Sequence, residues 1–462
     1  MSPFSNPTRR EFLKTTGGIL GASTLPAPFV WAASKTQDPE AKKPTLVIVY
    51  LRGGCDPLNV VVPFRDRDYY AIRPTIAIPG PGTKDLPEGT QPCIPLTKSF
   101  GLHPTMAPLK PLWDQGLFAP ILNVGSTHPT RSHFDAQDFM EWAAPGIKSI
   151  QEGWLNRYLQ RTATPNDHFL RAFSPQPLLP RALRGEYSVL AAPGPGSDAA
   201  LDAFAELYEC EDGTNEKSST GVAPGGTPPQ DKEEDAKKKK GEPVAERPPV
   251  TEEMLEDRLI DAGANTVTKL RHLNGILRNA REARKKYPRG QLGQQFADIA
   301  AVISANQPIE IAAIDYGGWD HHSYQGGTTG AQANMLGYLA ECMAAFANNL
   351  GPRMKNVCVL TMTEFGRTVA ENGTQGTDHG HGGFMMAMGG PVQGGEIFGK
   401  WTGLHPSRLY MKRDLPVWTD FRDVFAETLT GLYQFDWKEE DFFPGFRDPA
   451  KKPLGLFRAR EG

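Results

Sequence analysis

An uninterrupted apolar stretch near the amino end of the chain reads Thr45-Leu46-Val47-Ile48-Val49-Tyr50-Leu51 and is closely followed by Gly53-Gly54. Similar runs recur at residues 117–124, 309–315, 356–362 and 384–388. A strand with one face in water alternates apolar and polar residues, whereas a strand buried on both faces reads as a continuous apolar run. The runs therefore predict the strands of a central, mainly parallel sheet that is covered on both faces.

Two segments between these runs have the spacing of amphipathic helices. Residues 291–306 and 331–350 repeat large apolar side chains every three or four positions, which places those side chains on one stripe of a helix. Strands that alternate with helices are typical of a layered α/β domain. We therefore expect an α/β fold with three layers, α/β/α, in which ligands bind at the carboxyl ends of the parallel strands.

The composition narrows the class of protein. The 462 residues include 50 Lys and Arg against 53 Asp and Glu, with a formal net charge of -3, whereas a nucleic-acid-binding protein usually presents a basic surface. Nucleic acid is therefore not an expected partner. The 5 cysteines form no Cys-x-x-Cys pair, so neither a disulfide framework nor a cysteine-rich metal site is expected.

The first residues have the features of an export signal. The string Thr8-Arg9-Arg10-Glu11-Phe12-Leu13-Lys14 is a twin-arginine pattern, and a moderately apolar segment follows it. We expect residues 1–33 to be a Tat signal peptide that delivers the protein to the periplasm or the extracellular space. Several Gly and Pro residues interrupt the apolar segment, and no later stretch approaches the ~20 apolar residues that span a bilayer, so no permanent membrane span is expected.

One part of the chain differs sharply from the rest. Residues 211–250 are rich in Lys, Glu, Pro and Gly and contain almost no large apolar side chains, so we expect a disordered, charged insert. Residues 251–287 then resume as a charged amphipathic pattern, which predicts a helical insertion. Residues 45–462 would form one α/β domain that these two segments interrupt.

Polar side chains gather in the loops next to the predicted strands. Asp56 follows the first strand, Asp320 follows the run that ends at residue 315, and Asp378 precedes the last run. Six of the 10 histidines fall in the same loops, namely His128, His133, His321, His322, His379 and His381. Mixed Asp and His ligands suit Zn²⁺, Mn²⁺ or Fe. We predict one or two divalent metal ions held by Asp56, Asp320, His322, Asp378, His379 and His381.

Three of the polar loop residues also have structural interpretations. Asp56 is either a metal ligand or a turn residue, because Cys-Asp-Pro is favourable turn chemistry. Glu364 either caps a helix or supports a ligand from behind, and Arg367 either pairs with Glu364 or holds an oxyanion. We include both Glu364 and Arg367 among the candidate catalytic residues.

Ser132 and Arg131 complete the candidate catalytic set. Ser132 fits the N-cap of a helix, with Asp135 at the third helical position of an imperfect capping box. A hydroxyl group at a helix N-terminus, beside Arg131 and the predicted metals, is also where a nucleophile would be activated. Thr127, Thr130 and water are alternative nucleophiles.

Common catalytic motifs are missing from the sequence. It contains no Gly-x-Ser-x-Gly elbow, no Walker loop, no strand-linked Gly-x-Gly-x-x-Gly and no His-Glu-x-x-His. A classical serine hydrolase, a kinase and a nicotinamide dehydrogenase are therefore unsupported.

The ordered motifs of the chain resemble those of domain-of-unknown-function family 1501, Tat-exported bacterial proteins of the alkaline-phosphatase-like superfamily. The strings that carry the resemblance are residues 51–59, 100–104, 130–134, 318–322, 364–367, 378–382, 420–424 and 443–446. The resemblance implies an alkaline-phosphatase-like α/β/α fold that acts on phosphate or sulfate esters. It also implies that Asp56, Asp378 and His379 hold one ion and that Asp320, His322 and His381 hold the second.

We therefore expect an exported, metal-dependent hydrolase of phosphate or sulfate esters. Its partner would be an anionic ester, including a sulfated or phosphorylated glycan, which Ser132 or a water molecule attacks. The alternative is a non-catalytic exported module that keeps the fold and binds a polyanionic glycan or a partner protein, because the sulfatase string Cys-x-Pro-Ser-Arg is absent.

Overall fold

The computed structural model describes residues 43–195, 252–438, 442–446 and 453–459. The predicted signal peptide and the predicted charged insert lie outside these residues. The chain divides into two compact units, Met1–Pro195 with Leu273–Gly462, and Gly196–His272. All residues of the candidate site described below belong to the first unit.

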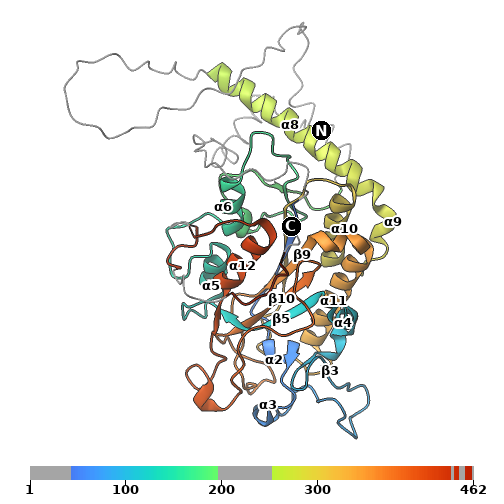
Figure 1. Cartoon of the computed structure of the whole chain (residues 1–462), viewed down its shortest axis with the longest axis vertical. Coiled ribbons are helices and arrows are strands. Elements are labelled where there is room, and N and C mark those ends of the chain that lie inside the picture. Colours follow the sequence, from blue (N-terminus) through green and yellow to red (C-terminus); the bar gives the residue numbers. More distant parts are fainter. Residues whose placement is uncertain (1–42, 196–251, 439–441, 447–452, 460–462) are drawn as a thin grey trace, which may run out of the picture. The chain divides into compact units, whose positions relative to one another are not determined.

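An eight-stranded sheet forms the centre of the first unit (Figure 1). Its strands stand in the order β11-β5-β10-β9-β1-β8-β6-β7. Their bounds are β1 Thr45–Arg52, β5 Phe118–Gly125, β6 Ala172–Ser174, β7 Leu190–Ala191, β8 Ile311–Gly317, β9 Val357–Met362, β10 Gly383–Gly389 and β11 Thr419–Asp420. A small antiparallel sheet has the order β2-β4-β3 and consists of β2 Val61–Val62, β3 Ile94–Pro95 and β4 Gly101–Leu102.

The large sheet is mostly parallel, as the continuous apolar runs predict. β1 pairs in parallel with β8 and with β9, so that Tyr50 lies opposite Asp315 and Met362. β10 is the exception, because it runs antiparallel to both β5 and β9. The start of β10 therefore lies at the edge where β1, β8 and β9 end, and the loop before β10 meets the loops that follow those strands.

Helices supply the cover that buries the two faces of the sheet. On one face Leu46, Ile48 and Tyr50 of β1 belong to a core that includes Trp154 and Phe425. Figure 1 shows α5, α6 and α12 on one side of the sheet and α10 and α11 on the other. These arrangements confirm a layered α/β fold with a mainly parallel sheet, and they explain why β1 contains no polar position between Leu46 and Leu51.

The remaining elements follow the expected pattern. α10 and α11 match the two helices predicted from apolar spacing, and α8 and α9 lie in the segment predicted as a helical insertion. The helix bounds are α2 Pro57–Val60, α3 Arg67–Ile72, α4 Lys110–Asp114, α5 His133–Glu141, α6 Trp154–Arg161, α8 Glu252–Asn279, α9 Arg281–Arg284, α10 Gln291–Ser304, α11 Ala331–Leu350 and α12 Phe421–Tyr433. The 3-10 helices are η1 Pro104–Leu109, η2 Arg181–Leu183, η3 Gly351–Asn356 and η4 Pro406–Arg408.

The structure also bears on membrane-spanning helices and on the cysteines. None of the helices in the described residues has the length together with the apolar character that a bilayer crossing requires. The described cysteines Cys55, Cys93, Cys342 and Cys358 are all buried and free.

Candidate metal centre

Loops at the carboxyl ends of β1 and β8 come into direct contact. Gly53 follows β1 with φ 123°, and a Cβ at this position would lie 2.7 Å from the backbone nitrogen of Asp320. Only glycine allows this approach, because a side chain would clash with the neighbouring loop and is disfavoured at positive φ. On the other side, Trp319 is fully buried and its indole N–H donates to the carbonyl of Tyr316 at 2.9 Å. Asp320 is therefore held in place from both sides.

In the loop that precedes His133, three side chains each accept a hydrogen bond from the backbone N–H two residues later. The hydroxyl oxygen of Ser126 accepts from the N–H of His128, Nδ1 of His128 accepts from the N–H of Thr130, and the hydroxyl oxygen of Thr130 accepts from the N–H of Ser132. Such local bonds fix the backbone of a loop without regular structure. They end at His133, the first residue of α5.

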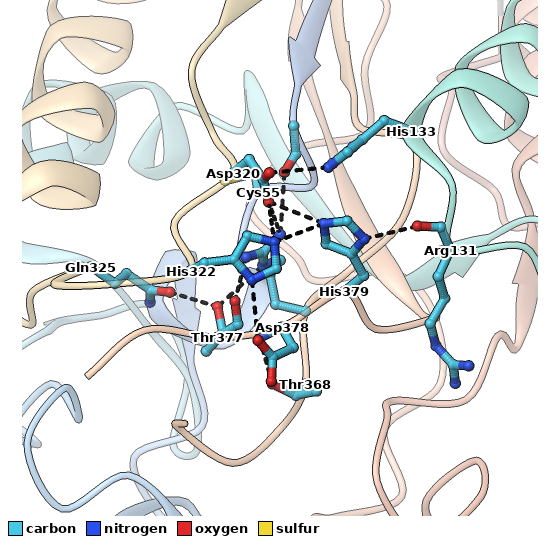
Figure 2. Close-up of polar contacts among 12 residues, drawn as sticks. Cys55, Arg131, His133, Asp320, His322, Gln325, Thr368, Thr377, Asp378 and His379 are labelled. Atoms are coloured by element: carbon cyan, nitrogen blue, oxygen red, sulfur yellow. Dashed lines mark hydrogen bonds and ion pairs between the residues drawn. The ribbon is translucent and has the colours of Figure 1, made fainter. Parts of the chain in front are cut away.

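Three side chains from distant parts of the chain form a group whose ligand atoms all lie within 4.8 Å of one another: His133, Asp320 and His379. Nε2 of His133 is 3.3 Å from Oδ2 of Asp320, and Nε2 of His379 is 3.1 Å from Oδ1 of the same carboxylate. His322 joins from the side, with its Nε2 at 3.0 Å from Oδ1 of Asp320 and 3.0 Å from Nε2 of His379. Figure 2 shows these side chains directed toward one another.

The second nitrogen of each imidazole is held by an acceptor. Nδ1 of His133 is 2.8 Å from Oε1 of Glu364, and Nδ1 of His379 is 2.8 Å from the carbonyl oxygen of Arg131. Nδ1 of His322 is 3.1 Å from Oδ1 of Asp378. A carboxylate or carbonyl oxygen only accepts, so each Nδ1 can donate to its partner, and Nε2 of each ring is then directed at the carboxylate of Asp320. A neutral ring that is protonated on Nδ1 presents a lone pair on Nε2, whereas a protonated ring donates from Nε2 to Asp320.

The Nε2 atoms meet at the centre of the group. Those of His322 and His379 face each other at 3.0 Å, and Nε2 of His133 is buried without a hydrogen bond. With neutral rings, these lone pairs and the carboxylate of Asp320 would be balanced by a cation, either a proton or a metal ion. Neutral imidazoles whose far nitrogen is bound by a carboxylate or carbonyl are the usual ligands of Zn²⁺ and similar ions. The residues of this group therefore fit a divalent metal.

Arg367 also acts on Asp320. Its guanidinium group is buried, and Nη1 donates to Oδ1 of Asp320 at 2.6 Å while Nε donates to the hydroxyl oxygen of Thr377 at 3.2 Å. Burial alone would raise the pKa of Asp320, but the hydrogen bond and positive charge of Arg367 outweigh it and hold that pKa below its ordinary value. Arg367 thus pairs with Asp320 rather than with Glu364, and it keeps the aspartate ionised.

Glu364 supports the site from behind and caps no helix. Its side chain is buried, and Oε1 accepts from the N–H of Gly53 at 2.8 Å and from the amide of Gln137 at 3.0 Å in addition to His133. The hydrogen bond to Glu364 raises the pKa of His133, whereas burial lowers that of His379. Glu364 thereby fixes both the ring of His133 and the turn after β1.

Asp56 is not brought into this group. Its carboxylate is buried and accepts from Nη1 of Arg73 at 2.5 Å, from Nη2 at 3.0 Å, from the amide of Gln325 at 2.7 Å and from the N–H of Leu58 at 3.2 Å. Asp56 is also the N-cap of α2. The charge that a metal would neutralise is already neutralised by Arg73, so the turn interpretation of Asp56 agrees with its surroundings.

Two other predicted ligands, His381 and Asp378, lie outside the ligand group. His381 is buried with its ring stacked on Tyr410 at 4.3 Å between centroids, and it is not part of the group. Asp378 orients His322 and also accepts from Asn372 at 3.1 Å. The sequence predicts one or two ions; among the described residues one group of ligands is formed, and it combines Asp320 and His379 from the two sets that the resemblance implies.

The candidate catalytic residues Arg131 and Ser132 flank the group. The guanidinium group of Arg131 binds Asp414 at 2.5 Å, and Figure 2 shows it directed away from the imidazoles while its carbonyl faces His379. Ser132 occupies the N-cap position of α5, but its side chain makes no capping hydrogen bond. Thr130 is used in the turn to Ser132, and Thr127 is exposed.

His133 belongs to the candidate group but is missing from the predicted ligand set. The sequence marks it as one of six histidines in the polar loops and as part of the string 130–134. The signal that marks it is its place after the loop that follows β5, one residue from Ser132, at the start of a helix. Its partner Glu364 is far away in the sequence, so the pairing is visible only in the fold.

The comparisons with known proteins agree with the resemblance of the motifs. A family model described as a protein of unknown function (DUF1501) matches residues 43–435. Neither a curated protein nor a solved structure matches the chain.

Proposed function

The chain belongs to the DUF1501 family, and on this premise we propose that it is an exported, metal-dependent hydrolase of phosphate or sulfate esters. The observation that supports the proposal is the convergence of His133, His322 and His379 on the carboxylate of Asp320, with their Nε2 atoms turned inward. The resident ion would be Zn²⁺, Mn²⁺ or Fe, because imidazole and carboxylate suit these metals.

The alkaline-phosphatase-like assignment is part of the proposal. It is supported by a mostly parallel sheet covered by helices and by a candidate centre at the carboxyl edge of that sheet. The string Asp378-His379-Gly380, expected to bind metal by resemblance, contributes His379 as a ligand and Asp378 as the partner of His322. The twin-arginine string supports export to the periplasm or the extracellular space.

The residues of the site have separable roles in this proposal. When bound, the metal supplies positive charge that polarises the ester and stabilises the leaving oxygen. Glu364 and Asp378 hold the proton on Nδ1 of His133 and His322 and thereby keep Nε2 of each ring free to bind. Arg367 keeps Asp320 ionised at the centre of the group.

Ser132 is the first candidate for the attacking group. It lies one residue from His133 and at the N-terminus of α5, whose dipole favours negative charge on an oxygen at this position. Attack by a water molecule forms the new bond to phosphorus or sulfur while the bond to the ester oxygen breaks, and the proton of the water passes to the leaving alcohol. Attack by the hydroxyl group of Ser132 likewise transfers its proton to the alcohol but leaves the phosphate or sulfate group on Ser132, and a water molecule then releases it and restores the hydroxyl group.

Metal analysis tests the first step of this proposal. The purified mature protein should contain stoichiometric metal, and a His133→Ala variant should lose most of it. His405→Ala is the matched control, because His405 is exposed at the N-cap position before η4 and lies outside the ligand group. A folded, metal-free parent protein would contradict the proposal.

Hydrolysis tests the second step. The metal-loaded protein should cleave aryl phosphates or aryl sulfates, and chelation should abolish the reaction. Cleavage that persists without metal would exclude the metal-dependent mechanism. Ser132→Ala then separates the two nucleophiles, because attack by water survives this substitution and attack by Ser132 does not.

A binding module is the second candidate function. The observation in its favour is that both predicted catalytic arginines are engaged, Arg131 with Asp414 and Arg367 with Asp320. In this case the metal-loaded protein would bind sulfated or phosphorylated glycans without releasing sulfate or phosphate. A glycan-binding measurement alongside the ester panel distinguishes the two functions.

A further inference from the structure

Three large apolar side chains protrude into solvent close to the metal ligands. Phe134 is 80% exposed, Tyr324 is 76% exposed and Met411 is 70% exposed. Single exposed apolar residues are common on protein surfaces, but an accumulation beside a polar centre usually has a function. Three of the six exposed large hydrophobic side chains among the described residues belong to this set, which we call the apolar rim.

Each rim residue is connected to a ligand by the chain or by hydrogen bonds. Phe134 directly follows His133, and Tyr324 lies two residues after His322. Sδ of Met411 accepts from Nη2 of Arg131 at 3.9 Å, and the carbonyl oxygen of Arg131 is bound by His379. Phe134 and Tyr324 therefore lie on segments that carry the candidate centre, whereas Met411 lies in a neighbouring turn that Arg413 joins to the carbonyl oxygen of His379.

The backbone holds two of these side chains in a costly conformation. Tyr324 has φ 48° and Met411 has φ 52°. A bulky residue at positive φ is rare, and such strain costs on the order of 1 kcal/mol or more unless the surroundings impose it. Neither side chain recovers this cost by burial, because both are mostly exposed. Backbone pairing imposes these conformations, because Met411 lies in the tight turn between the paired residues Tyr410 and Asp414, and the N–H of Tyr324 donates to the carbonyl of Thr374. The turns thus fix the two side chains outside the core.

Positive charge accompanies the apolar side chains. Arg413 is partly exposed and donates from Nη2 to the carbonyl oxygen of His379 at 2.9 Å, and Lys412 beside it is exposed. Arg131 retains some exposure behind its pair with Asp414. The surface around the centre therefore combines cations with apolar side chains, which complements a ligand that has an anionic group and a ring.

We propose that Phe134, Tyr324 and Met411 bind the apolar face of a ring, aromatic or sugar, to which the anionic ester is attached. This inference rests on the proposed function, because it assigns the part of the substrate that the metal does not hold. Aromatic side chains and methionine sulfur contact flat apolar surfaces favourably. The rim residues would determine specificity, and the metal ligands would bind the ester group.

Binding measurements on the metal-loaded protein test the rim. Phenyl sulfate, glucose 6-sulfate and inorganic sulfate serve as probes, with the three matching phosphate compounds in parallel. Phe134→Ala and Tyr324→Ala should each weaken binding of the ring-bearing esters by about 2- to 10-fold, as expected for loss of an aromatic contact. Binding of the inorganic anion and the metal content should not change. The phenyl and glucose compounds distinguish an aromatic ring from a sugar ring.

Leu178→Ala is the matched control, because Leu178 is 75% exposed but follows β6 and lies outside the ligand loops. The proposal is overturned if the rim variants bind the ring-bearing esters as the parent does, or if they lose the inorganic anion equally. A change of oligomeric state in the rim variants, with unchanged ester binding, would instead identify the rim as a contact between copies. Absence of hydrolysis with retained, rim-dependent binding would contradict the hydrolase alone.

Discussion

Two aspartates follow neighbouring parallel strands after the same Gly-Gly-x spacing, yet their charges are neutralised in different ways. Asp56 follows Gly53-Gly54-Cys55 at the end of β1, and Asp320 follows Gly317-Gly318-Trp319 at the end of β8. The pair formed by Asp56 and Arg73 is almost fully buried, with side-chain exposures of 1% and 0%.

Asp320 has the opposite surroundings. Its side chain is 40% exposed, and one arginine and three imidazoles surround it. Both aspartates have an arginine partner, but only Asp320 also faces imidazole nitrogens and solvent. The comparison teaches that the same Gly-Gly-x-Asp string provides a candidate metal ligand only where the aspartate stays open to further partners.

The largest loss of stability should follow from breaking the buried ion pair of Asp56 and Arg73. Arg73→Met leaves the carboxylate of Asp56 buried without its counter-charge and removes donors to the carbonyls of Val369 and Thr368. Loss of one partner of a buried ion pair costs about 3–5 kcal/mol, so the free energy of unfolding in denaturant should fall by this amount. A loss below 1 kcal/mol would mean that water or another group replaces Arg73.

Acid should lower the free energy of unfolding, because it protonates the buried His103. Burial lowers the pKa of His103 to about 4, and its ring lies 2.8 Å from the hydroxyl group of Thr105 and 2.9 Å from the carbonyl oxygen of Gly327. The folded pKa lies below the ordinary value of 6.5, so the contribution is complete above pH 6.5 and is lost as pH falls toward 4.

The loss should amount to about 2–3 kcal/mol, because one pKa unit corresponds to about 1.4 kcal/mol. Unfolding measured between pH 7 and pH 4 should show a steeper decline for the parent than for His103→Gln, which has no proton to gain. Equal slopes would exclude His103 as the responsible group.

Added metal should stabilise the fold through the group around Asp320 and not through the pair of Asp56 and Arg73. Zn²⁺ at 100 times its dissociation constant should raise the free energy of unfolding by about 2.7 kcal/mol. Asp320→Asn should abolish this increment, whereas Asp56→Asn should preserve it at a lower starting stability. If the stabilisation by Zn²⁺ also depended on Asp56, both aspartates would belong to one metal site.

The smallest effect should come from the residues behind the ligands. Glu364→Gln weakens the acceptor that holds His133, and such outer partners typically change metal affinity by 10- to 100-fold. Asp378→Asn should change it less, because the side chain of Asp378 is 51% exposed and water can replace its contact to His322. Competition with a metal-sensitive dye measures both, and the reverse order would show that His322 contributes more than His133.

Much of the architecture follows from local pattern. The continuous apolar runs locate β1, β5, β8, β9 and β10 because burial on both faces removes every polar position from them. β6, β7 and β11 are only two or three residues long, so they leave no such pattern. The direction of β10 is set by its neighbours β5 and β9 and not by its own sequence.

The candidate centre was predictable as a place but not as a set of ligands. Asp320 and His379 were expected from their loops, and the carboxyl edge was the expected location. The role of Asp56 depends on Arg73, which no spacing connects to it, and the role of His133 depends on Glu364 in another loop. Such pairings arise from tertiary contacts. Residue type and spacing alone therefore cannot distinguish a side chain that is paired within the protein from one that can bind a ligand.

The antiparallel direction of β10 bears on the order in which the protein folds. β9 and β10 are adjacent and joined by residues 363–382, so Glu364, Arg367, Asp378 and His379 lie on one connection that closes locally. Asp320 arrives only after β8 has paired with the distant β1, and His133 only after β5 has paired with the distant β10; non-local pairings of this kind form slowly. During refolding, metal uptake should therefore be a late event that reports a completed topology.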